Sequence, residues 1–509
     1  MLTKPYDLAV IGGGINGAGI ARDAAGRGLS VLLVERDDLA AHTSSASTKL
    51  IHGGLRYLEY YKFRLVRESL QERERLMAIA PHLSRPLRFV LPMPRGGRPA
   101  WMLRIGLWLY DHIGGRVSLP RSEAVDLAAP PYAGLLKPEI ARGFAYSDCQ
   151  TDDARLVVAN AMDAAERGAT VLTGVEVRTA RPAGDLWEID LAANPDRPAP
   201  PEAIPARVMA RALVNAAGPW AGTVLDAIEN AERKGAVRLV KGSHIVVPRC
   251  YEGEHAFLFQ NPDGRIVFAI PWRDSFTLIG TTDITVGEEE RAQPHITEAE
   301  TAYLCEAVSA YLAAPVRPDQ VVHSYAGVRP LYDDGKAEAK AVTRDYVLQL
   351  GRKTGPQVLS IYGGKLTTYR RLAEHALEKL APFLPAMGAP WTASVPLAGG
   401  DVPGGDVALL VRATLEQWPF LSPAEARRLV AAYGTRVSMV LGEAACLADL
   451  GEQFGGGLSE AELSYLAEHE WARTAEDVLW RRGKLGLVCP PETAAKIAGW
   501  FRNEKMHFG

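Results

Sequence analysis

The hydrophobic positions near the start of the chain alternate between strand-like and helix-like patterns. Residues 6–11 (YDLAVI) form a short apolar run of strand-forming residues, and residues 20–27 have the spacing of a helix that stops at Gly28. Residues 29–35 (LSVLLVE) are apolar almost throughout, which is typical of a parallel strand buried on both faces. This order predicts the first half of a Rossmann-like, dinucleotide-binding α/β unit.

A Gly-X-Gly-X-X-Gly turn connects the first strand to the helix. In such a turn Gly12 makes the tight bend, Gly14 lets the backbone approach a pyrophosphate, and Gly17 allows close helix–strand packing. The N-terminus of the helix then offers free N–H groups to the phosphates. Glu35 lies 23 residues after Gly12, close to the spacing of about 20 residues for an acid that binds ribose hydroxyls. The alternative, a purely structural turn, does not explain the strand and the acid that follow.

Two later segments favour FAD over NAD as the dinucleotide. Residues 212–217 (ALVNAA) predict a strand that ends at Gly218, and residues 358–362 predict a strand that leads into a second glycine turn, GGKLTTY, and a helix. A glycine turn at a helix N-terminus suits the electron-rich pyrimidine edge of a flavin. A site built from three distant segments suits the longer FAD molecule. The predicted contacts from the later segments are Ala217, Gly218, Gly364, Lys365, Leu366 and Thr367.

Several longer motifs are more specific than the glycine turns. They are TSSASTKLIHGGLRYLE at 43–59, NAAGPWA at 215–221, GVRPL at 327–331, YGGKLTTYR at 362–370 and EWARTAEDVLWRRGKLGL at 470–487. With these motifs the chain resembles, nearly end to end, the FAD-dependent glycerol-3-phosphate dehydrogenases of the aerobic, respiratory type. The resemblance implies oxidation of sn-glycerol 3-phosphate to dihydroxyacetone phosphate, with electrons passed to membrane quinone.

The resemblance also implies an α/β fold with three parts. The first is a Rossmann-like FAD-binding domain of the glutathione-reductase/amino-acid-oxidase type, expected to be discontinuous at 1–85, 145–225 and 340–390. The second is an antiparallel β substrate-binding domain at 86–144 and 226–339, where short strand-like runs and turn signals alternate. The third is a C-terminal helical cap domain at 395–509.

A phosphate monoester needs fixed cations, and arginine suits it because its planar fork binds phosphate oxygens bidentately. Arg56, Arg329 and Arg344 are the candidates, with a surface ion pair as the alternative for each. Lys365 stands near a helix start, where a cation opposes the helix dipole. This unfavourable placement suggests that Lys365 stabilises negative charge on the reduced flavin or holds substrate, with Thr367 adding a hydroxyl or a helix cap.

Oxidation of a secondary alcohol needs a base for the hydroxyl proton, and histidine has a suitable pKa. His52 and His244 are both candidates, and an activated water or a lysine with a lowered pKa stays open. Tyr57 is expected to bind a substrate oxygen or to pack beside the flavin ring. In the context of the resemblance, the polar residues after Glu35 are expected to contact the FAD phosphates and ribitol: Ser44, Ser45, Thr48 and Lys49.

Composition limits the class of protein and its partners. Hydrophobic residues make up 47% and charged residues 23%, as in ordinary soluble domains. The formal net charge of −3 gives no global basic field for nucleic acid. Five scattered cysteines without a CxxC pair predict a reducing compartment and no structural metal. With no signal peptide and no apolar run of about 18 residues or more, the expected location is cytoplasmic.

One segment predicts contact with a membrane surface. Residues 100–113 are rich in Trp, Leu and Ile but too short to span a bilayer. Apolar bulk with interfacial aromatics and basic flanks favours a helix lying in the surface of the membrane's inner face. A buried helix and a homodimer contact are the alternatives. The flanking basic residues are Arg95, Arg98, Arg104 and Arg116.

Two other classes of function stay open at this point. A flavin oxidase of similar fold would use dioxygen on the same substrate or on an amine, but several candidate cations favour a phosphate over a single carboxylate. A non-catalytic FAD-binding protein would not need His52, Arg329 and Lys365 together.

Overall fold

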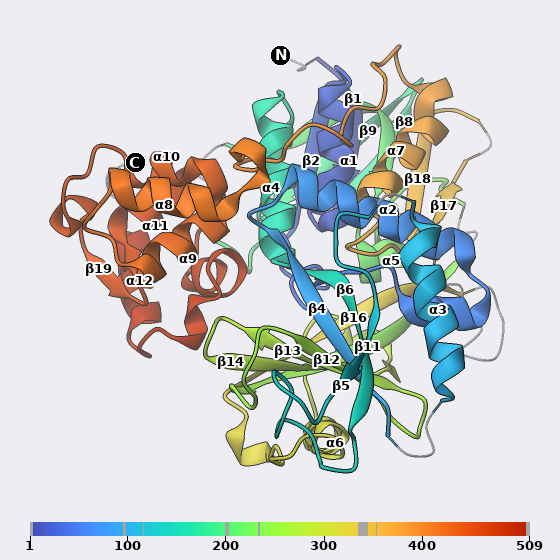
Figure 1. The fold of residues 1–509 in the computed structure, drawn as a ribbon. Helices are drawn as coiled ribbons and strands as arrows, with labels where there is room; N and C mark the ends of the chain where they lie inside the picture. Colours follow the sequence, from blue (N-terminus) through green and yellow to red (C-terminus); the bar gives the residue numbers. More distant parts are fainter. Residues whose placement is uncertain are drawn as a thin grey trace.

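The computed structural model describes residues 4–94, 98–115, 117–198, 203–232, 235–333, 345–352 and 354–504. Two large β-sheets and a C-terminal helical region lie side by side (Figure 1). The helices outside the C-terminal region are α1 (Ile15–Gly26), α2 (Phe63–Ile79), α3 (Ala100–Ile113), α4 (Asp153–Glu166), α5 (Ala221–Asp226), α6 (Glu298–Ser309) and α7 (Tyr369–Leu380), with short 3-10 turns η1 (Leu55–Tyr60) and η2 (Gly218–Trp220).

The first sheet joins strands from distant parts of the sequence. The order is β17-β18-β10-β1-β2-β7, with β9 paired to β10 and β8 to β9. Strand β1 is parallel to both β2 and β10, and β10 is parallel to β18. The predicted Rossmann-like arrangement of parallel strands is thereby confirmed. Its strands are β1 (Tyr6–Ile11), β2 (Val31–Glu35), β7 (Thr170–Thr173), β8 (Val175–Ala183), β9 (Leu186–Ala193), β10 (Arg207–Asn215), β17 (Val347–Leu350) and β18 (Gln357–Tyr362).

Both faces of this sheet are covered, which explains the continuous apolar character of its central strands. Leu8 and Val10 pack in one core with the helices α1, α4 and α7, whereas Ala9 and Ile11 pack in another with Trp187 of β9. The alternation follows from the period of two along a strand. Every side chain of β2 is buried for the same reason.

The second sheet is mainly antiparallel, as predicted, apart from a parallel pairing of β12 with β4. Its faces pack on α6 and on α2 with α3. Strand β3 and most of β6 fall within ranges expected for the FAD domain but belong to this sheet, because β6 pairs with β4 along its length. The strands are β3 (Leu50–Ile51), β4 (Ser84–Pro92), β5 (Glu123–Asp126), β6 (Arg142–Thr151), β11 (Ala236–Pro248), β12 (Ala256–Gln260), β13 (Ile266–Trp272), β14 (Phe276–Gly280), β15 (Ile284–Thr285) and β16 (His323–Asp333).

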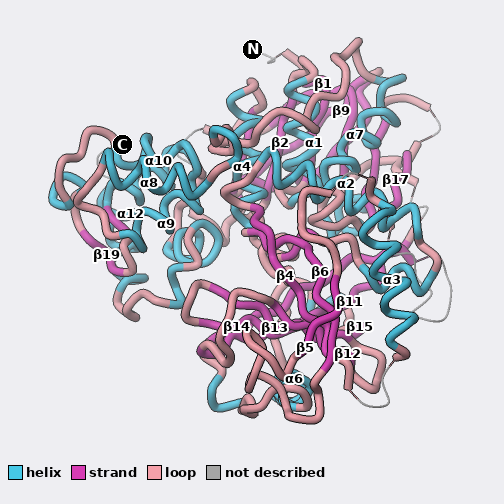
Figure 2. The backbone as a smooth tube through the Cα atoms, viewed as in Figure 1, coloured by secondary structure: helices cyan, strands magenta, loops and turns pink. Residues whose placement is uncertain are grey.

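The C-terminal region is mostly helical, as Figure 2 shows. It packs against both sheets: Trp480 stacks on His323 of β16 at 4.1 Å between ring centroids, and Arg473 Nη1 donates to the carbonyl of Thr173 in β7 at 3.2 Å. The predicted C-terminal helical domain is confirmed. Its elements are α8 (Val407–Gln417), α9 (Pro423–Tyr433), α10 (Val437–Leu441), β19 (Gln453–Gly455), β20 (Leu458–Ser459), α11 (Glu460–His469), the π-helical turn η9 (Asp477–Arg482) and α12 (Thr493–Glu504).

Helix α3 lies on the outside of the molecule (Figure 1). It buries Leu107 and Tyr110 against α2 and η1, while Trp101 is 65% exposed and Trp108 is 60% exposed. The alternative of a fully buried helix is therefore wrong. Within the described part of the chain, none of the helices has the length and hydrophobicity that crossing a membrane requires.

Candidate cofactor and active site

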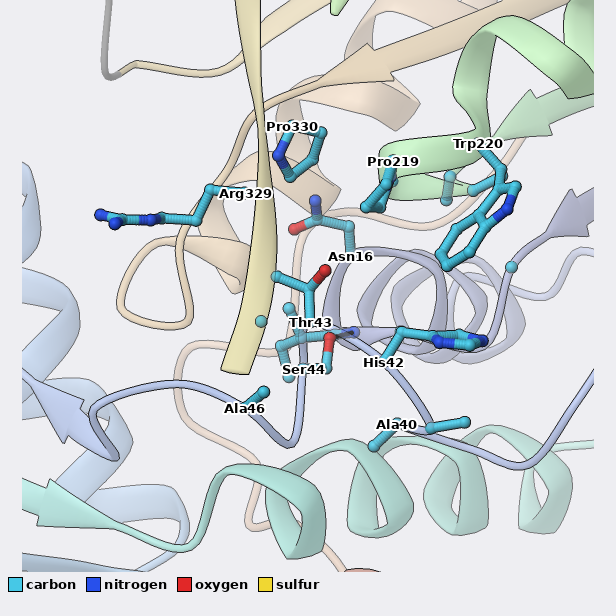
Figure 3. Close-up of a pocket in the computed structure, with 18 of the residues that line it drawn as sticks. Asn16, Ala40, His42, Thr43, Ser44, Ala46, Pro219, Trp220, Arg329 and Pro330 are labelled. Carbon is cyan, nitrogen blue, oxygen red and sulfur yellow. Dashed lines mark hydrogen bonds between the residues drawn. The ribbon is translucent and has the colours of Figure 1, made fainter. Parts of the chain in front are cut away.

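A cavity of about 1320 Å³ lies at the carboxyl ends of β1, β2 and β10 and reaches β11 and β16 of the second sheet. Figure 3 shows Asn16 beside residues of the loop after β2 and of β16. Most of the predicted site residues line this cavity: Gly12, Gly14, Glu35, Ser44, Thr48, His52, Tyr57, Ala217, Gly218, His244, Arg329, Gly364, Lys365, Leu366 and Thr367.

The first glycine turn leaves no room for side chains. A Cβ atom on Gly17 would lie 1.9 Å from the carbonyl oxygen of Gly12, and one on Gly12 would lie 2.7 Å from that of Ala216. Gly14 precedes α1, whose first N–H, that of Ile15, donates to Ser44 Oγ at 3.0 Å. A bare backbone and a helix N-terminus facing a cavity are the features that a pyrophosphate requires.

Glu35 ends β2 at the edge of the cavity. Its carboxylate accepts hydrogen bonds from the N–H groups of Gly13 at 2.6 Å and Asp37 at 2.7 Å. Burial raises the pKa of Glu35, and these hydrogen bonds oppose that rise. The position agrees with the expected ribose contact. His42 lies in the same region and was not among the residues predicted from the sequence. Its ring centroid lies 4.5 Å from that of Trp220, and its Nε2 lies 2.8 Å from Asp37.

The second glycine turn lies against the start of α1. Gly363 and Gly364 both have positive φ angles, 77° and 98°. The carbonyl of Gly363 accepts a hydrogen bond from Asn16 Nδ2 at 3.2 Å, while Asn16 Oδ1 is buried without a hydrogen-bond partner in the described residues. Asn16 was missed as a site residue because it stands at a variable position of the glycine motif. It joins two turns that are 347 residues apart.

Lys365 is the clearest sign of a ligand that carries negative charge. Its Nζ is buried without a hydrogen-bond partner among the described residues and lies 4.0 Å from the ring centroid of Tyr57. An ammonium group has three donors, and leaving them unused in a buried position is costly. The lysine stands in the turn before α7, which begins at Tyr369. The residues present therefore fit a flavin whose pyrimidine oxygens face this turn.

The two candidate bases both line the cavity; His244 is buried, whereas His52 is half-buried. His244 stacks on Tyr325 with ring centroids 4.9 Å apart, and its Nε2 lies 2.9 Å from Thr48 Oγ1. Burial, followed by the positive charges of Lys49 and Arg329, holds the pKa of His244 well below its usual range. Burial also lowers the pKa of His52, whose backbone N–H donates to Thr367 Oγ1 at 3.3 Å. Both imidazoles are thus neutral and able to accept a proton.

Arg329 projects from β16 at the cavity wall (Figure 3). Its Nη2 donates to the carbonyl of Thr282 at 3.2 Å and to Asp283 Oδ1 at 3.1 Å. The side chain is 36% exposed, so one guanidinium edge is fixed by the protein while the residue still faces the cavity. Arg329 therefore forms an ion pair at the cavity wall, and its contact with a substrate phosphate stays a prediction.

Four of the residues that were predicted to contact FAD or substrate do not line the cavity. Lys49 Nζ is held by Asp153 at 2.8 Å, because a buried charge needs a charged partner. Ser45 Oγ donates to the carbonyl of His42, and Arg56 donates to the hydroxyl of Tyr60 at 3.4 Å. None of these three residues lines the cavity, and Gly17, the fourth, does not line it either. Arg344 lies outside the described residues.

Comparison with known proteins decides the family. A family model described as FAD dependent oxidoreductase matches residues 7–370, and one described as the C-terminal domain of alpha-glycerophosphate oxidase matches residues 390–499. The chain belongs to the FAD-dependent oxidoreductases. Its cofactor is FAD, and the resemblance predicted from the sequence is confirmed.

Individual relatives match this FAD-dependent oxidoreductase along nearly its whole length. It is 51% identical to a glycerol-3-phosphate dehydrogenase of Pseudomonas aeruginosa over 99% of this chain and 97% of the relative. It is 48% identical to the aerobic glycerol-3-phosphate dehydrogenase of Escherichia coli over 97% of each chain. It is also 46% identical to D-erythritol 1-phosphate dehydrogenase of Brucella abortus over 98% of each. The crystal structure of glycerol-3-phosphate dehydrogenase from Bacillus halodurans complexed with FAD matches with a TM-score of 0.74 and 27% identity, covering 100% of this chain and 94% of that one.

Replacing Gly17 by alanine should abolish FAD binding, since the new methyl group would overlap the carbonyl of Gly12 in the pyrophosphate turn. The measurement is the FAD content of the purified protein, read from its visible spectrum. Gly28→Ala is the matched control: Gly28 has a positive φ but no atom within 4 Å of the added Cβ. It should lose about 1–2 kcal/mol of stability, because alanine disfavours the left-handed conformation, and keep its FAD. Equal FAD content in the two variants would contradict the role given to the turn.

Proposed function

We propose that this oxidoreductase oxidises sn-glycerol 3-phosphate to dihydroxyacetone phosphate and passes the electrons to membrane quinone. The observation that carries the proposal is the set of groups lining one cavity: the guanidinium of Arg329, the neutral imidazole of His244, and the ammonium of Lys365, which has no hydrogen-bond partner in the described residues. Cations suit a phosphate monoester, and a neutral imidazole suits the removal of a hydroxyl proton. The full-length similarity to two glycerol-3-phosphate dehydrogenases supports the same substrate.

Each residue has a separate task in the proposed reaction. Arg329, which Asp283 and Thr282 hold at the cavity wall, binds phosphate oxygens, and Lys365 holds a further oxygen of the substrate or of the flavin. His244 accepts the proton of the substrate's C2 hydroxyl, because Tyr325 and Thr48 fix the orientation of its ring. Bound FAD supplies a hydride acceptor for the C2 carbon.

A longer polyol phosphate is the second candidate substrate. The similarity to D-erythritol 1-phosphate dehydrogenase is nearly as extensive as that to the glycerol-3-phosphate dehydrogenases. Both substrates share a phosphate monoester and a secondary alcohol, so the chemistry assigned to Arg329 and His244 is the same for each.

Arg329→Ala should lower kcat/KM for sn-glycerol 3-phosphate at least tenfold, because one charge-assisted hydrogen bond contributes about 1.5–3 kcal/mol. The assay uses a soluble dye as electron acceptor, so the membrane does not enter the result. Arg317→Ala, an exposed arginine paired with Asp319, is the control and should stay close to wild type. Wild-type kcat/KM for D-erythritol 1-phosphate, measured alongside, decides between the two substrates. A wild-type value for Arg329→Ala would rule out the phosphate contact.

The rate of substrate oxidation at saturating substrate should stay nearly constant between about pH 6 and 8. Burial keeps the pKa of His244 below this window, so the base is already neutral at every pH within it. His244→Gln should lower this rate by about 10²- to 10⁴-fold, and His52→Gln should lower it less. The assignment would fail if the wild-type rate fell as the pH was lowered, with a midpoint near pH 6.5, which is about the ordinary pKa of histidine, and if His244→Gln removed this dependence of the rate on pH.

A patch of exposed apolar residues supports the proposed location on the inner face of the membrane. It lies on α3 and on the neighbouring end of η1 and start of α2, and we call it the aromatic patch. Arg104 is exposed within it and has no ion pair in the described chain, while Arg98 pairs with Glu59. Arg95 and Arg116 lie outside the described residues. The members of the patch are Tyr60, Tyr61, Phe63, Trp101, Met102, Ile105 and Trp108.

An interfacial helix of this kind would bring the enzyme to a lipid-soluble electron acceptor. The spacing of Trp101, Ile105 and Trp108 puts all three on one side of α3, opposite the buried Leu107 and Tyr110. Quinone rather than dioxygen is therefore the acceptor that we propose. A contact between two copies of the chain would use the same surface and is tested by the same variants.

Replacing Trp101 and Trp108 by serine should reduce binding to anionic lipid vesicles at least fivefold in a sedimentation assay, because interfacial tryptophans anchor such helices. Activity with a soluble dye should not change. Leu409→Ser with Met439→Ser, which removes two exposed apolar side chains from the C-terminal region, is the control. Unchanged vesicle binding together with a change from dimer to monomer in size-exclusion chromatography would instead assign the patch to a dimer interface.

A further inference from the structure

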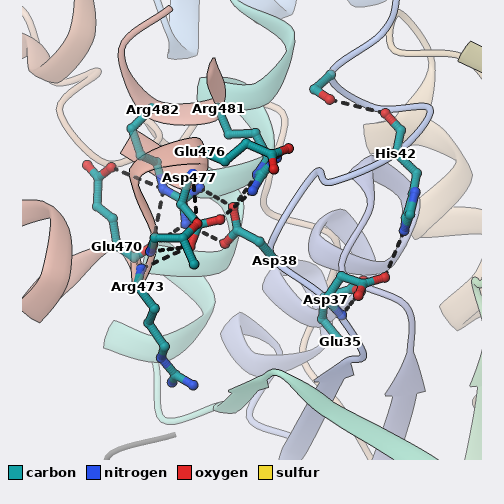
Figure 4. A network of polar contacts seen from close by, with 12 residues as sticks. Glu35, Asp37, Asp38, His42, Glu470, Arg473, Glu476, Asp477, Arg481 and Arg482 are labelled. Carbon is teal, nitrogen blue, oxygen red and sulfur yellow. Dashed lines mark hydrogen bonds and ion pairs between the residues drawn. The ribbon is translucent and has the colours of Figure 1, made fainter. Parts of the chain in front are cut away.

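The loop that follows β2 is held from two sides. On the cavity side, Glu35 and His42 line the FAD site, and Asp37 bonds to His42. On the opposite side, Asp38 points away from the cavity and is fully buried. Figure 4 shows its carboxylate facing Arg481 and Arg482 of the C-terminal region.

The contact between Asp38 and the two arginines is made of several charge-assisted hydrogen bonds. Arg482 donates through Nη1 at 2.7 Å and through Nη2 at 2.8 Å, and Arg481 donates through Nε. All three side chains are 7% exposed or less. The partners are more than 440 residues apart in sequence, so the bond joins the FAD-binding loop directly to the π-helical turn η9.

The two arginines are fixed in turn by their own surroundings. Asp477, also in η9, accepts hydrogen bonds from Arg481 and from Arg197, and Arg482 donates to the carbonyl of Glu470. Arg197 and Arg481 also line the cavity. The C-terminal region therefore forms part of the wall on the side of Glu35, where it meets the dinucleotide-binding unit.

The residues after Asp38 transmit this anchoring to the glycine turn. Leu39 and Ala40 are buried, and the N–H of Ala40 donates to the carbonyl of Gly13 at 3.2 Å. Ala40 has a φ of 61°, a conformation that a non-glycine residue keeps only when its surroundings fix it. The segment from Glu35 to His42 is thus clamped between the glycine turn and η9.

We propose that Arg481 and Arg482 are positioning residues for FAD and that the C-terminal region retains the cofactor through Asp38. Without these partners the buried Asp38 carboxylate has to move towards water, and Glu35, Asp37 and His42 move with the loop. The expected effect is on how tightly FAD is held rather than on the chemical step.

The test is the FAD dissociation constant of the deflavinated full-length protein, followed by flavin fluorescence. Asp38→Asn and Arg482→Met alter opposite ends of the same contact, and each should raise the dissociation constant at least tenfold. Saturating FAD should restore the turnover of Asp38→Asn with a soluble dye to within about twofold of wild type, because catalytic groups are untouched.

Arg428→Met is the matched control. Arg428 forms a largely buried, two-pronged ion pair with Glu462 inside the same C-terminal region, and its contacts in the described residues include neither the loop after β2 nor Arg481 or Arg482. Its dissociation constant for FAD should stay within threefold of wild type. If Arg428→Met raises the constant as much as the two loop variants, general loosening of the C-terminal region explains the effect and the proposal fails. It also fails if Asp38→Asn, the more conservative variant, binds FAD like wild type while circular dichroism shows a folded chain.

Discussion

Parallel pairing of β1, β10 and β18 is the constraint on which the site depends. The register places Ile11 beside Asn215 and Asn215 beside Ser360, so three strands that are hundreds of residues apart end at one edge. The chain leaves each strand through a short turn that faces the same cavity. The glycine turn, the segment at Gly218 and the turn that carries Lys365 meet there for this geometric reason.

The second sheet supplies the groups that distinguish this cavity from a simple dinucleotide site. His244 and Arg329 lie on the paired strands β11 and β16 and face the turn of Lys365 across the cavity. Burial keeps the imidazole of His244 neutral, and the Lys365 ammonium is buried without a hydrogen-bond partner among the described residues. An anionic substrate with an ionisable hydroxyl group fits both properties, since each group is in the charge state that its proposed task needs.

Local patterns in the sequence predicted the parts of the fold that depend on local physics. The strand, the glycine turn, the helix and the terminal acid Glu35 each have a signature within a few residues, and each is found, although the helix begins at Ile15 rather than at Ile20. Lys49 shows what these local patterns do not predict. Nothing near Lys49 indicates that Asp153, 104 residues away, binds its ammonium. Asp38 was missed for the same reason, because its arginine partners lie more than 440 residues away in the sequence. Asn16 was missed because it stands at a variable position of the glycine motif.

The most direct measurement is anaerobic addition of sn-glycerol 3-phosphate to the purified, FAD-loaded protein while its visible spectrum is recorded. The account predicts a yellow protein whose flavin absorption is bleached promptly, with dihydroxyacetone phosphate as the product. A yellow protein that stays oxidised with this substrate would contradict the proposed reaction while leaving FAD binding intact. A protein that stays colourless after incubation with FAD would contradict the cofactor site itself.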